Sequence, residues 1–162
     1  MMSQRIKGLN PIINSNTEIL IIGTFPGEKS RERNQYYAGS QNQFWNIMSD
    51  VLNTDLVNLE YKNRINILQE CKIGLWDAIE SCEIKGSLDK NIKKPEYNDF
   101  SHLIRIKKII CNGKAVEEKY IKYCQKPNSV KVLRVPSSSS ANNGSIGRLE
   151  QWREKITDNF KN

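Results

Sequence analysis

Residues that bind metal ions are scarce in this sequence. It contains a single histidine, His102, and four cysteines, none of them spaced as C-x-x-C. Zinc and iron–sulfur sites need several such ligands at short spacings, so we expect no metal site and no cofactor. We expect the cysteines to be reduced, mostly buried thiols. His102 lies in the segment NDFSHLIRI, where Asp99 or Ser101 would cap the start of a helix, and we interpret it as a structural or surface residue.

Long hydrophobic runs are also missing. No apolar run approaches the roughly 20 residues that a membrane-spanning helix needs. The N-terminal segment MMSQRIKGLNPIINSN has no apolar stretch like that of a signal peptide. We therefore expect a cytoplasmic protein without a membrane partner. A chain of 162 residues with 38% hydrophobic residues is long enough for one globular domain, which we place over residues 1–162.

Positive charge is the main compositional feature that is present. The chain has 25 lysines and arginines against 18 aspartates and glutamates, which gives a formal net charge of +7. A basic balance of this size suits a polyanionic partner such as nucleic acid, although many basic proteins have no such partner.

Apolar segments of two kinds alternate along the chain. The continuous run at 19–23, ILIIG, is typical of a parallel strand that is covered on both faces. Further strands are predicted at 72–77, 106–111 and 130–135, and amphipathic helices at 43–52, 114–124 and 146–160, the last with a stripe that ends at Phe160. Strands that alternate with helices predict βαβ units in an α/β fold with a mainly parallel sheet. The polar, lysine-rich stretch 80–99 is expected to be an exposed loop or a short excursion over the sheet edge.

Two unusual loops follow predicted strands, where ligands bind in open α/β sheets. They are GTFPGEKS at 23–30 and PSSSSANN at 136–143. The first does not fit a nucleotide-binding P-loop, because Glu28 separates the glycine from Lys29 and Pro26 lacks a backbone N–H. Asp77, which could serve a magnesium ion, is followed by A-I-E, a pattern that predicts a helix N-cap with Glu80 as its partner.

A pocket for a planar heterocycle explains the first loop better. Aromatic faces together with an amide hold such a ring by stacking and edge hydrogen bonds, and residues 23–45 supply Phe25, Tyr36, Tyr37 and Asn42. The alternative is that the two tyrosines only cover the sheet, next to a core that contains Phe44 and Trp45. Residue chemistry alone leaves both interpretations open.

The same stretch, GTFPGEKSRERNQYYAGSQNQFW, resembles motif one of the uracil-DNA glycosylase superfamily, and most closely that of the hypoxanthine-DNA glycosylase branch. Three further segments resemble the branch in the expected order: 75–93, the NGK at 112–114, and VPSSSSAN at 135–142. The last is similar to the superfamily's second motif, the loop that enters DNA near the extruded base.

The resemblance implies a single-domain three-layer sandwich with a central four-stranded parallel sheet flanked by helices. It implies an enzyme that hydrolyses the N-glycosidic bond of a deaminated base in DNA, as a monomer and without a metal or other cofactor. Hypoxanthine is the expected base, with uracil as a second candidate, because Phe25 and Val135 stand where many relatives carry polar residues. A catalytically silent nucleic-acid-binding module is the alternative. A nucleoside hydrolase is disfavoured, since a free nucleoside has no flanking phosphates to bind.

Site residues also follow from the resemblance. The asparagine of the N-x-F-W element is Asn42, expected to orient water or to hydrogen-bond the departing base; it could also cap the helix that begins near Gln43. Asp77 and Ser81 are further candidates for reading the base. The predicted base pocket is Gly23, Thr24, Phe25, Pro26, Tyr37 and Asp77. The predicted DNA contacts are Ser137, Ser138, Ser139, Ser140 and Asn142, with the serines binding phosphates and Asn142 either holding the loop or touching the DNA strand.

Overall fold

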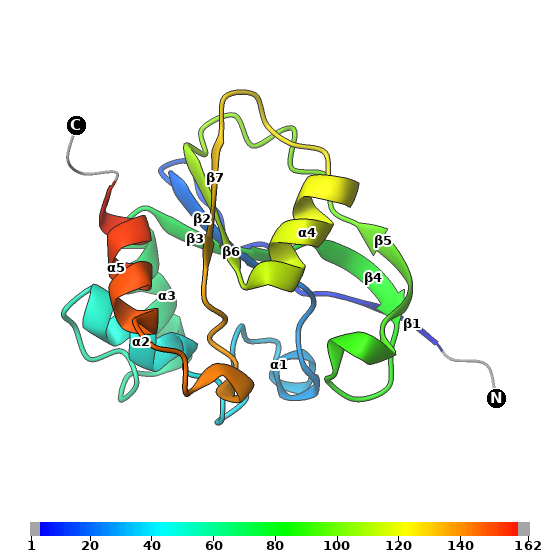
Figure 1. Cartoon of the computed structure of the whole chain (residues 1–162), viewed down its shortest axis with the longest axis horizontal. Coiled ribbons are helices and arrows are strands. Elements are labelled where there is room, and N and C mark those ends of the chain that lie inside the picture. The colour runs from blue at the N-terminus through cyan, green and yellow to red at the C-terminus, as the bar shows by residue number, and fades with distance from the viewer. Residues whose placement is uncertain (1–3, 159–162) are drawn as a thin grey trace.

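The central sheet has four parallel strands. A computed structural model of the chain describes residues 4–158, and Figure 1 shows its elements. The strand order is β3-β2-β6-β7. The strands are β2 (Ile19–Gly23), β3 (Ile73–Asp77), β6 (Lys108–Asn112) and β7 (Lys131–Val135). The predicted α/β fold with a four-stranded parallel sheet is therefore confirmed.

Helices cover both faces of this sheet because successive residues of β2 point to opposite sides. Ile19 and Ile21 pack towards one face, and Leu20 and Ile22 towards the other. The first face is covered by three helices, the second by α4 and the segment around Phe100. The helices of the first face are α2 (Phe44–Val51), α3 (Tyr61–Glu70) and α5 (Arg148–Thr157), and α4 spans Lys114–Tyr123.

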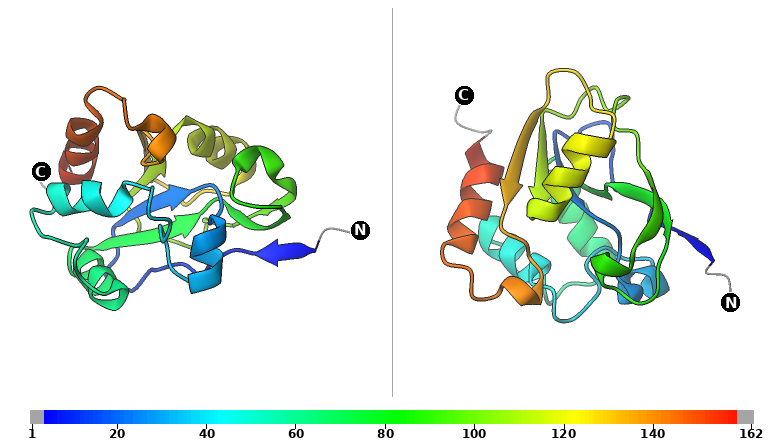
Figure 2. Two further views of the ribbon diagram at one scale, coloured as in Figure 1. Left: turned by 90° about the horizontal axis from the view of Figure 1, so that it is seen from below. Right: turned by 45° about the vertical axis from the view of Figure 1, so that its right-hand side comes forward.

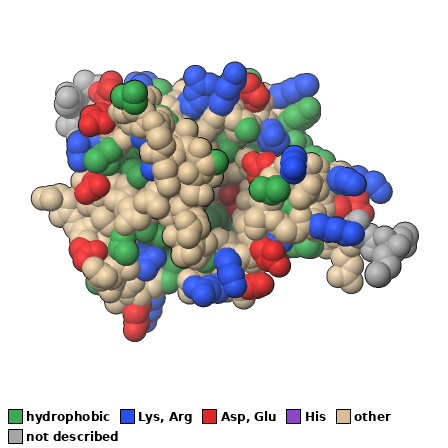
Figure 3. Space-filling view, turned by 60° about the horizontal axis from the view of Figure 1, so that its bottom comes forward, with side chains coloured by type: hydrophobic (Ala, Val, Ile, Leu, Met, Phe, Trp, Pro, Cys, Tyr) green, Lys and Arg blue, Asp and Glu red, His purple; other side chains and the backbone are tan. Residues whose placement is uncertain are grey.

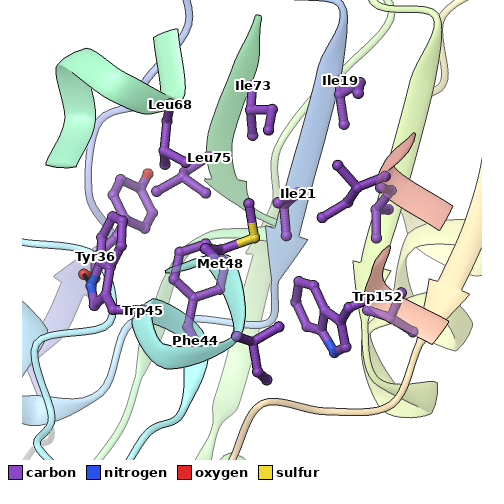
Figure 4. Packing of buried hydrophobic residues seen from close by; sticks show 14 of the residues in the cluster. Ile19, Ile21, Tyr36, Phe44, Trp45, Met48, Leu68, Ile73, Leu75 and Trp152 are labelled. Atoms are coloured by element: carbon purple, nitrogen blue, oxygen red, sulfur yellow. Dashed lines mark hydrogen bonds between the residues drawn. The ribbon is translucent and has the colours of Figure 1, made fainter. Parts of the chain in front are cut away.

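Figure 4 shows the packing on the first face. Phe44 and Met48 of α2 point towards the sheet residues Ile21 and Leu75. Trp152 of α5 packs against the same face of the sheet beside them. Phe44 is fully buried and meets Trp152 edge to face, with ring centroids 6.0 Å apart. The prediction that Phe44 and Trp45 belong to the core is confirmed.

A second, antiparallel sheet replaces the loop that the sequence predicted over residues 80–99. Its order is β1-β4-β5, and its strands are β1 (Arg5–Lys7), β4 (Ile79–Glu83) and β5 (Lys93–Tyr97). The 3₁₀ turn η1 (Asp89–Asn91) joins β4 to β5. The exposed-loop alternative was wrong because a small apolar cluster, built on Ile79, Cys82 and Ile84, buries one side of this polar segment.

Two predicted helix starts are also absent. Asp77 is not an N-cap, because the chain continues from β3 through Ala78 directly into β4, and the Ala78 N–H donates to the Gly23 carbonyl. Asp99 and Ser101 form a turn closed by a bond from the Ser101 N–H to Asp99 Oδ1, so His102 begins no helix.

The remaining predictions of helices at 43–52, 114–124 and 146–160 agree with α2, α4 and α5, although Phe160 lies outside the described residues. The short helix α1 (Glu28–Arg33) follows the first unusual loop and was not predicted. All four cysteines are free thiols and three of them are buried. Within residues 4–158, no helix is long and apolar enough to cross a membrane.

Candidate active site

A cleft of about 600 Å³ lies at the carboxyl ends of the parallel strands. Its walls come from the loop after β2, the segment before α2, the loop around η1, the end of β6 and the loop after β7. Seen from below in Figure 2, these loops surround the strand ends. Figure 3 shows the hollow in this face, with lysine and arginine side chains mostly around its margin. The cleft therefore joins segments more than 100 residues apart.

Eleven of the thirteen residues predicted for the site line this cleft. They are Gly23, Thr24, Phe25, Pro26, Tyr37, Asn42, Asp77, Ser137, Ser138, Ser139 and Ser140. Asn142 lies beside a neighbouring depression instead, which it shares with Ser137 and Ser139. Ser81 is placed away from the cleft, on β4, where its hydroxyl accepts a bond from Arg5 and donates one to Glu96. The hypothesis that Ser81 reads a base is therefore wrong.

Asn42 is held by its carbonyl oxygen. Oδ1 accepts hydrogen bonds from the Phe44 N–H at 2.9 Å and from the Ser138 hydroxyl at 2.8 Å. A backbone N–H can only donate, so the atom facing Phe44 must be oxygen, which fixes the orientation of the amide. Both lone pairs of Oδ1 are thus in use. Nδ2 donates to none of the residues 4–158, and it is the polar atom that the side chain can offer to a ligand in the cleft.

The helix-capping alternative for Asn42 holds at the same time. Gln43 occupies the N-cap position of α2, and Asn42 Oδ1 satisfies the N–H of Phe44 in the first turn. The first N–H groups of a helix have no partner within it. Asn42 therefore caps the helix start with Oδ1 alone, and this bond does not use its amide nitrogen.

Ser138 and Asn112 connect this amide to the end of β6. Asn112 donates from Nδ2 to Ser138 Oγ at 2.9 Å, and its Oδ1 accepts the Ser138 N–H at 2.9 Å. Ser138 is 1% exposed and its hydroxyl proton is committed to Asn42. The residue predicted to bind a DNA phosphate is therefore buried, and its hydroxyl holds the carbonyl oxygen of Asn42 instead of facing solvent. Sequence reasoning gave Asn112 no role, although the NGK segment at the strand end pointed to it.

The loop after β7 is anchored from α5. Arg148 donates to the carbonyls of Ser137 and Ser139 at 3.2 and 3.4 Å, and Trp152 Nε1 donates to the Pro136 carbonyl at 2.8 Å. Asn142 Nδ2 also donates to the Ser137 carbonyl, at 3.0 Å, so it holds the loop from within. Arg148 was not predicted as a site residue, since nothing in its sequence context marks it. Ser139 and Ser140 remain at least partly accessible to solvent.

Gly113 allows the close approach of this loop to β6. Its φ is +108°, a conformation that residues with a side chain rarely adopt, and a Cβ there would lie 3.2 Å from Ser137 Cβ. The glycine of NGK therefore allows the loop after β7, which carries the serines at 137–140 and is called the serine loop below, to pack against the strand end that carries Asn112.

The Tyr37 ring lies in the wall of the cleft. Its rear face stacks on Phe44, with centroids 3.9 Å apart and an interplanar angle of 19°. Asn112 Nδ2 donates to its hydroxyl at 3.2 Å. Its backbone has φ +56°, which costs about 1 kcal/mol for a residue that is not glycine. Burial and the nearby charge of Asp77 raise the pKa of the Tyr37 phenol, so the ring stays neutral.

Asp77 is a buried carboxyl at the floor of the cleft. The residue is 6% exposed, and its Oδ2 has no hydrogen-bond partner within the described part of the chain. A Cβ on Gly23 would lie 2.8 Å from Oδ1, which explains why glycine ends β2. Burial, and secondly the charge of Asp89, raise the pKa of Asp77 to about 7, against a smaller opposing effect of the Gly23 backbone.

The family model described as the uracil DNA glycosylase superfamily matches residues 11–161. The chain belongs to this superfamily. The resemblance seen in motif one, in segment 75–93 and in the serine loop is thereby confirmed.

Relatives and a solved structure agree with this membership. A protein of Methanosarcina barkeri (strain Fusaro / DSM 804) named hypoxanthine DNA glycosylase is 37% identical over 153 residues, covering 91% of this chain and 96% of its own. A protein of Methanosarcina acetivorans with the same name is 34% identical, covering 90% and 94%. A solution NMR structure from M. acetivorans, described as a candidate uracil DNA glycosylase, superimposes with a TM-score of 0.80 at 30% identity, covering 96% and 98%.

Proposed function

We propose that this protein is a DNA glycosylase that hydrolyses the N-glycosidic bond of a deaminated base, with hypoxanthine as its main substrate. The observation that carries the proposal is the amide of Asn42, fixed through Oδ1 with Nδ2 free beside the ring of Tyr37. The names of the two Methanosarcina relatives support hypoxanthine, and superfamily membership supports the glycosylase reaction.

The cleft suits an extruded base. Enzymes that act on a base in duplex DNA take it out of the stack and hold it between flat side chains. Tyr37 offers a ring that Phe44 supports from behind, and Phe25 and Pro26 extend the apolar wall. A cleft of about 600 Å³ has room for a bicyclic purine with part of its sugar.

Asn42 stabilises the departing base in this proposal. Glycosidic cleavage passes through a sugar that resembles an oxocarbenium ion, while negative charge develops on the base. With Oδ1 already occupied, Asn42 can only donate, and a donor aimed at developing negative charge lowers the barrier. Of the two roles expected for Asn42, this geometry favours bonding to the base over orienting water. A water molecule completes the reaction at C1′ and leaves an abasic site.

The accessible serines bind the DNA backbone. Ser137, Ser139 and Ser140 lie on the rim of the cleft, in a loop tied down by Arg148. Hydroxyl and backbone N–H groups are common phosphate ligands, and such contacts position DNA without reading its sequence. The positive net charge supports DNA as the partner.

Labelled duplexes with one deoxyinosine or one deoxyuridine test the proposal. After incubation, alkali converts abasic sites into strand breaks. We expect cleavage at deoxyinosine, and the Asn42→Ala variant should be slower by about 100-fold or more, the usual cost of losing one such donor. The matched control is Asn46→Ala, an exposed asparagine four residues on in α2 whose Nδ2 bonds only Gln43.

Each other outcome has a defined meaning. Cleavage that survives Asn42→Ala would keep the enzyme and remove Asn42 from the mechanism. Binding of the duplexes without cleavage of either base would favour the silent nucleic-acid-binding module. A loss of activity in Asn46→Ala equal to that in Asn42→Ala would show that the effect is not specific to the cleft.

A further inference from the structure

The mechanism above lacks an acid. Asn42 has an amide that cannot give up a proton at neutral pH, and motif one carries Phe25 where many relatives carry a polar residue. The ionisable residues that line the cleft are Glu28, Lys29, Tyr36, Tyr37, Asp77, Asp89 and Lys114. Of the carboxylic acids among them, Glu28 and Asp89 are exposed, whereas Asp77 is buried at the floor.

Within the glycosylase function proposed above, on which this assignment rests, we propose that Asp77 is the catalytic acid for purine excision. The proton of its carboxyl group passes to N7 of the extruded hypoxanthine as the bond between C1′ and N9 breaks.

The position of the carboxyl supports this role. Asp77 is among the residues that line the cleft, whereas its Oδ2 is closed to solvent and has no hydrogen-bond partner within residues 4–158. A buried carboxyl oxygen without a partner disfavours the charged form of the group, so the carboxyl holds a proton that it can give to a base in the cleft. Asp77 also ends β3, where it pairs with Gly23 at the end of β2, next to the loop that carries Phe25, so it lies within the same wall as the predicted base pocket.

The surroundings favour the neutral form of the carboxyl up to about pH 7. Asp89 from η1 places a second negative charge near it, and Tyr36 and Tyr37, from the segment before α2, are close enough for the charge of Asp77 to raise the pKa of each phenol. On the cleft walls, Glu28 and Lys29 come from α1 and Lys114 from α4, and Lys119 of α4 acts on Asp89. Yet no lysine or arginine within residues 4–158 forms a salt bridge with Asp77. A group with a pKa of about 7 is well matched to proton transfer near neutral pH.

The proton balance of the step is complete. The Asp77 carboxyl loses its proton to N7, and the electron pair of the C1′–N9 bond goes to the base, which leaves as neutral hypoxanthine. Water adds to the sugar at C1′ and loses a proton to solvent. The Asp77 carboxylate takes up a proton from solvent before the next turnover, so the reaction consumes one water molecule and no other reagent.

The pH profile of single-turnover cleavage at deoxyinosine tests the assignment. The pKa of Asp77 is raised, so the neutral acid is present below pH 7 and is lost above it. We expect the rate to be level below about pH 7 and to fall about tenfold per pH unit above it. Asp77→Asn should lose about 100-fold or more and show no such decline. Asp89→Asn removes the neighbouring charge, which lowers the pKa of Asp77, and should move the decline to lower pH.

A modified substrate tests the same step in the native protein, without any risk of misfolding. In 7-deaza-2′-deoxyinosine a carbon replaces N7, so Asp77 has no atom to protonate. We expect the duplex that contains the 7-deaza analogue to bind as tightly as the deoxyinosine duplex. Its cleavage should be slower by about 100-fold or more. Cleavage of both substrates at equal rates would overturn the assignment. An Asp77→Asn variant with the wild-type rate and pH profile would do the same, while cleavage of deoxyinosine by the native protein would leave the glycosylase function standing. If the native protein cleaved neither deoxyinosine nor deoxyuridine at any pH, the function itself would fail.

Discussion

Ser138 and Asn112 hold the Asn42 amide in place, and neither has a spare side-chain donor for a DNA phosphate. Asn112 uses both protons of Nδ2, on Tyr37 and Ser138, and its oxygen on the Ser138 N–H. Buried polar chains of this kind hold a site in one arrangement when every member is satisfied. The geometry of the amide is therefore set by residues from β6 and from the loop after β7.

Ser138→Ala should slow base excision without weakening DNA binding. The substitution removes one of the two donors to Asn42 Oδ1 and the acceptor for Asn112. We expect a fall in single-turnover rate of about 10- to 100-fold, the scale of a misplaced catalytic group. Binding to a duplex with an uncleavable analogue, measured by fluorescence anisotropy, should stay within about twofold.

The neighbouring serine supplies the contrast. Ser140 is exposed on the same loop, so Ser140→Ala should weaken duplex binding and leave the rate at saturating enzyme nearly unchanged. If Ser138→Ala changed binding and Ser140→Ala changed the rate, the roles assigned to these two residues would be reversed.

Among the elements, α5 supports the site although none of its residues lines the main cleft. Trp152 is fully buried against Phe44, and its Nε1 holds the Pro136 carbonyl at the start of the serine loop. Phe44 in turn supports the ring of Tyr37. Through Trp152, α5 thus supports both the ring of Tyr37, by way of Phe44, and the start of the loop after β7.

Trp152→Ala should destabilise the fold by about 3–5 kcal/mol, the usual cost of removing a buried aromatic side chain. Trp152→Phe keeps most of the packing but leaves the Pro136 carbonyl without its partner, and should cost about 1–3 kcal/mol. Urea unfolding followed by circular dichroism measures both. Gln151→Ala, at an exposed position of the same helix, is the control and should stay within about 0.5 kcal/mol. Equal stability of Trp152→Phe and the native chain would show that the indole bond contributes nothing.

The sequence predicted the elements whose signal is local. The run at 19–23 is apolar without interruption because β2 is covered on both faces, and the stripes of α2 and α5 repeat at helical spacing. The second sheet could not be predicted in this way. Strands β4 and β5 pair with register shifts, β5 is largely exposed, and the cluster that buries β4 draws Ile6 and Phe25 from distant segments.

Some residues of the candidate site could likewise be predicted from a local sequence pattern, and others could not. Asn42 and Tyr37 belong to a motif that is contiguous in sequence, so they could be predicted together. Ser138 stands among four consecutive serines, and only its burial separates it from the others. Arg148 acts through its bonds to carbonyls 9 and 11 residues away, which depend on the turn before α5 and leave no pattern in the sequence.

For the whole molecule, positive charge is expected to dominate the encounter with DNA. Log K for duplex binding should fall linearly with log salt concentration, with a slope of about −0.9 for each phosphate neutralised. Lys114 lines the cleft with its side chain largely exposed, so Lys114→Ala should reduce the slope by about 1. Ser140→Ala should lower the affinity without changing the slope, since a hydroxyl displaces no counterion. Fluorescence anisotropy over a salt series measures both, and an affinity independent of salt would contradict a charge-driven contact.

The outer edge of the second sheet bears on how copies of this protein behave towards each other. Among the strands formed by residues 4–158, β5 pairs only with β4, on one side, and its exposed residues include Lys93, Lys94 and Pro95. A free strand edge is a template for another chain, but lysines repel a second copy and proline offers no N–H for pairing. Several copies of a DNA-binding enzyme come close to each other when they bind the same DNA molecule, and they must not aggregate there. The three residues at this edge discourage the strand-to-strand aggregation that such crowding would otherwise promote.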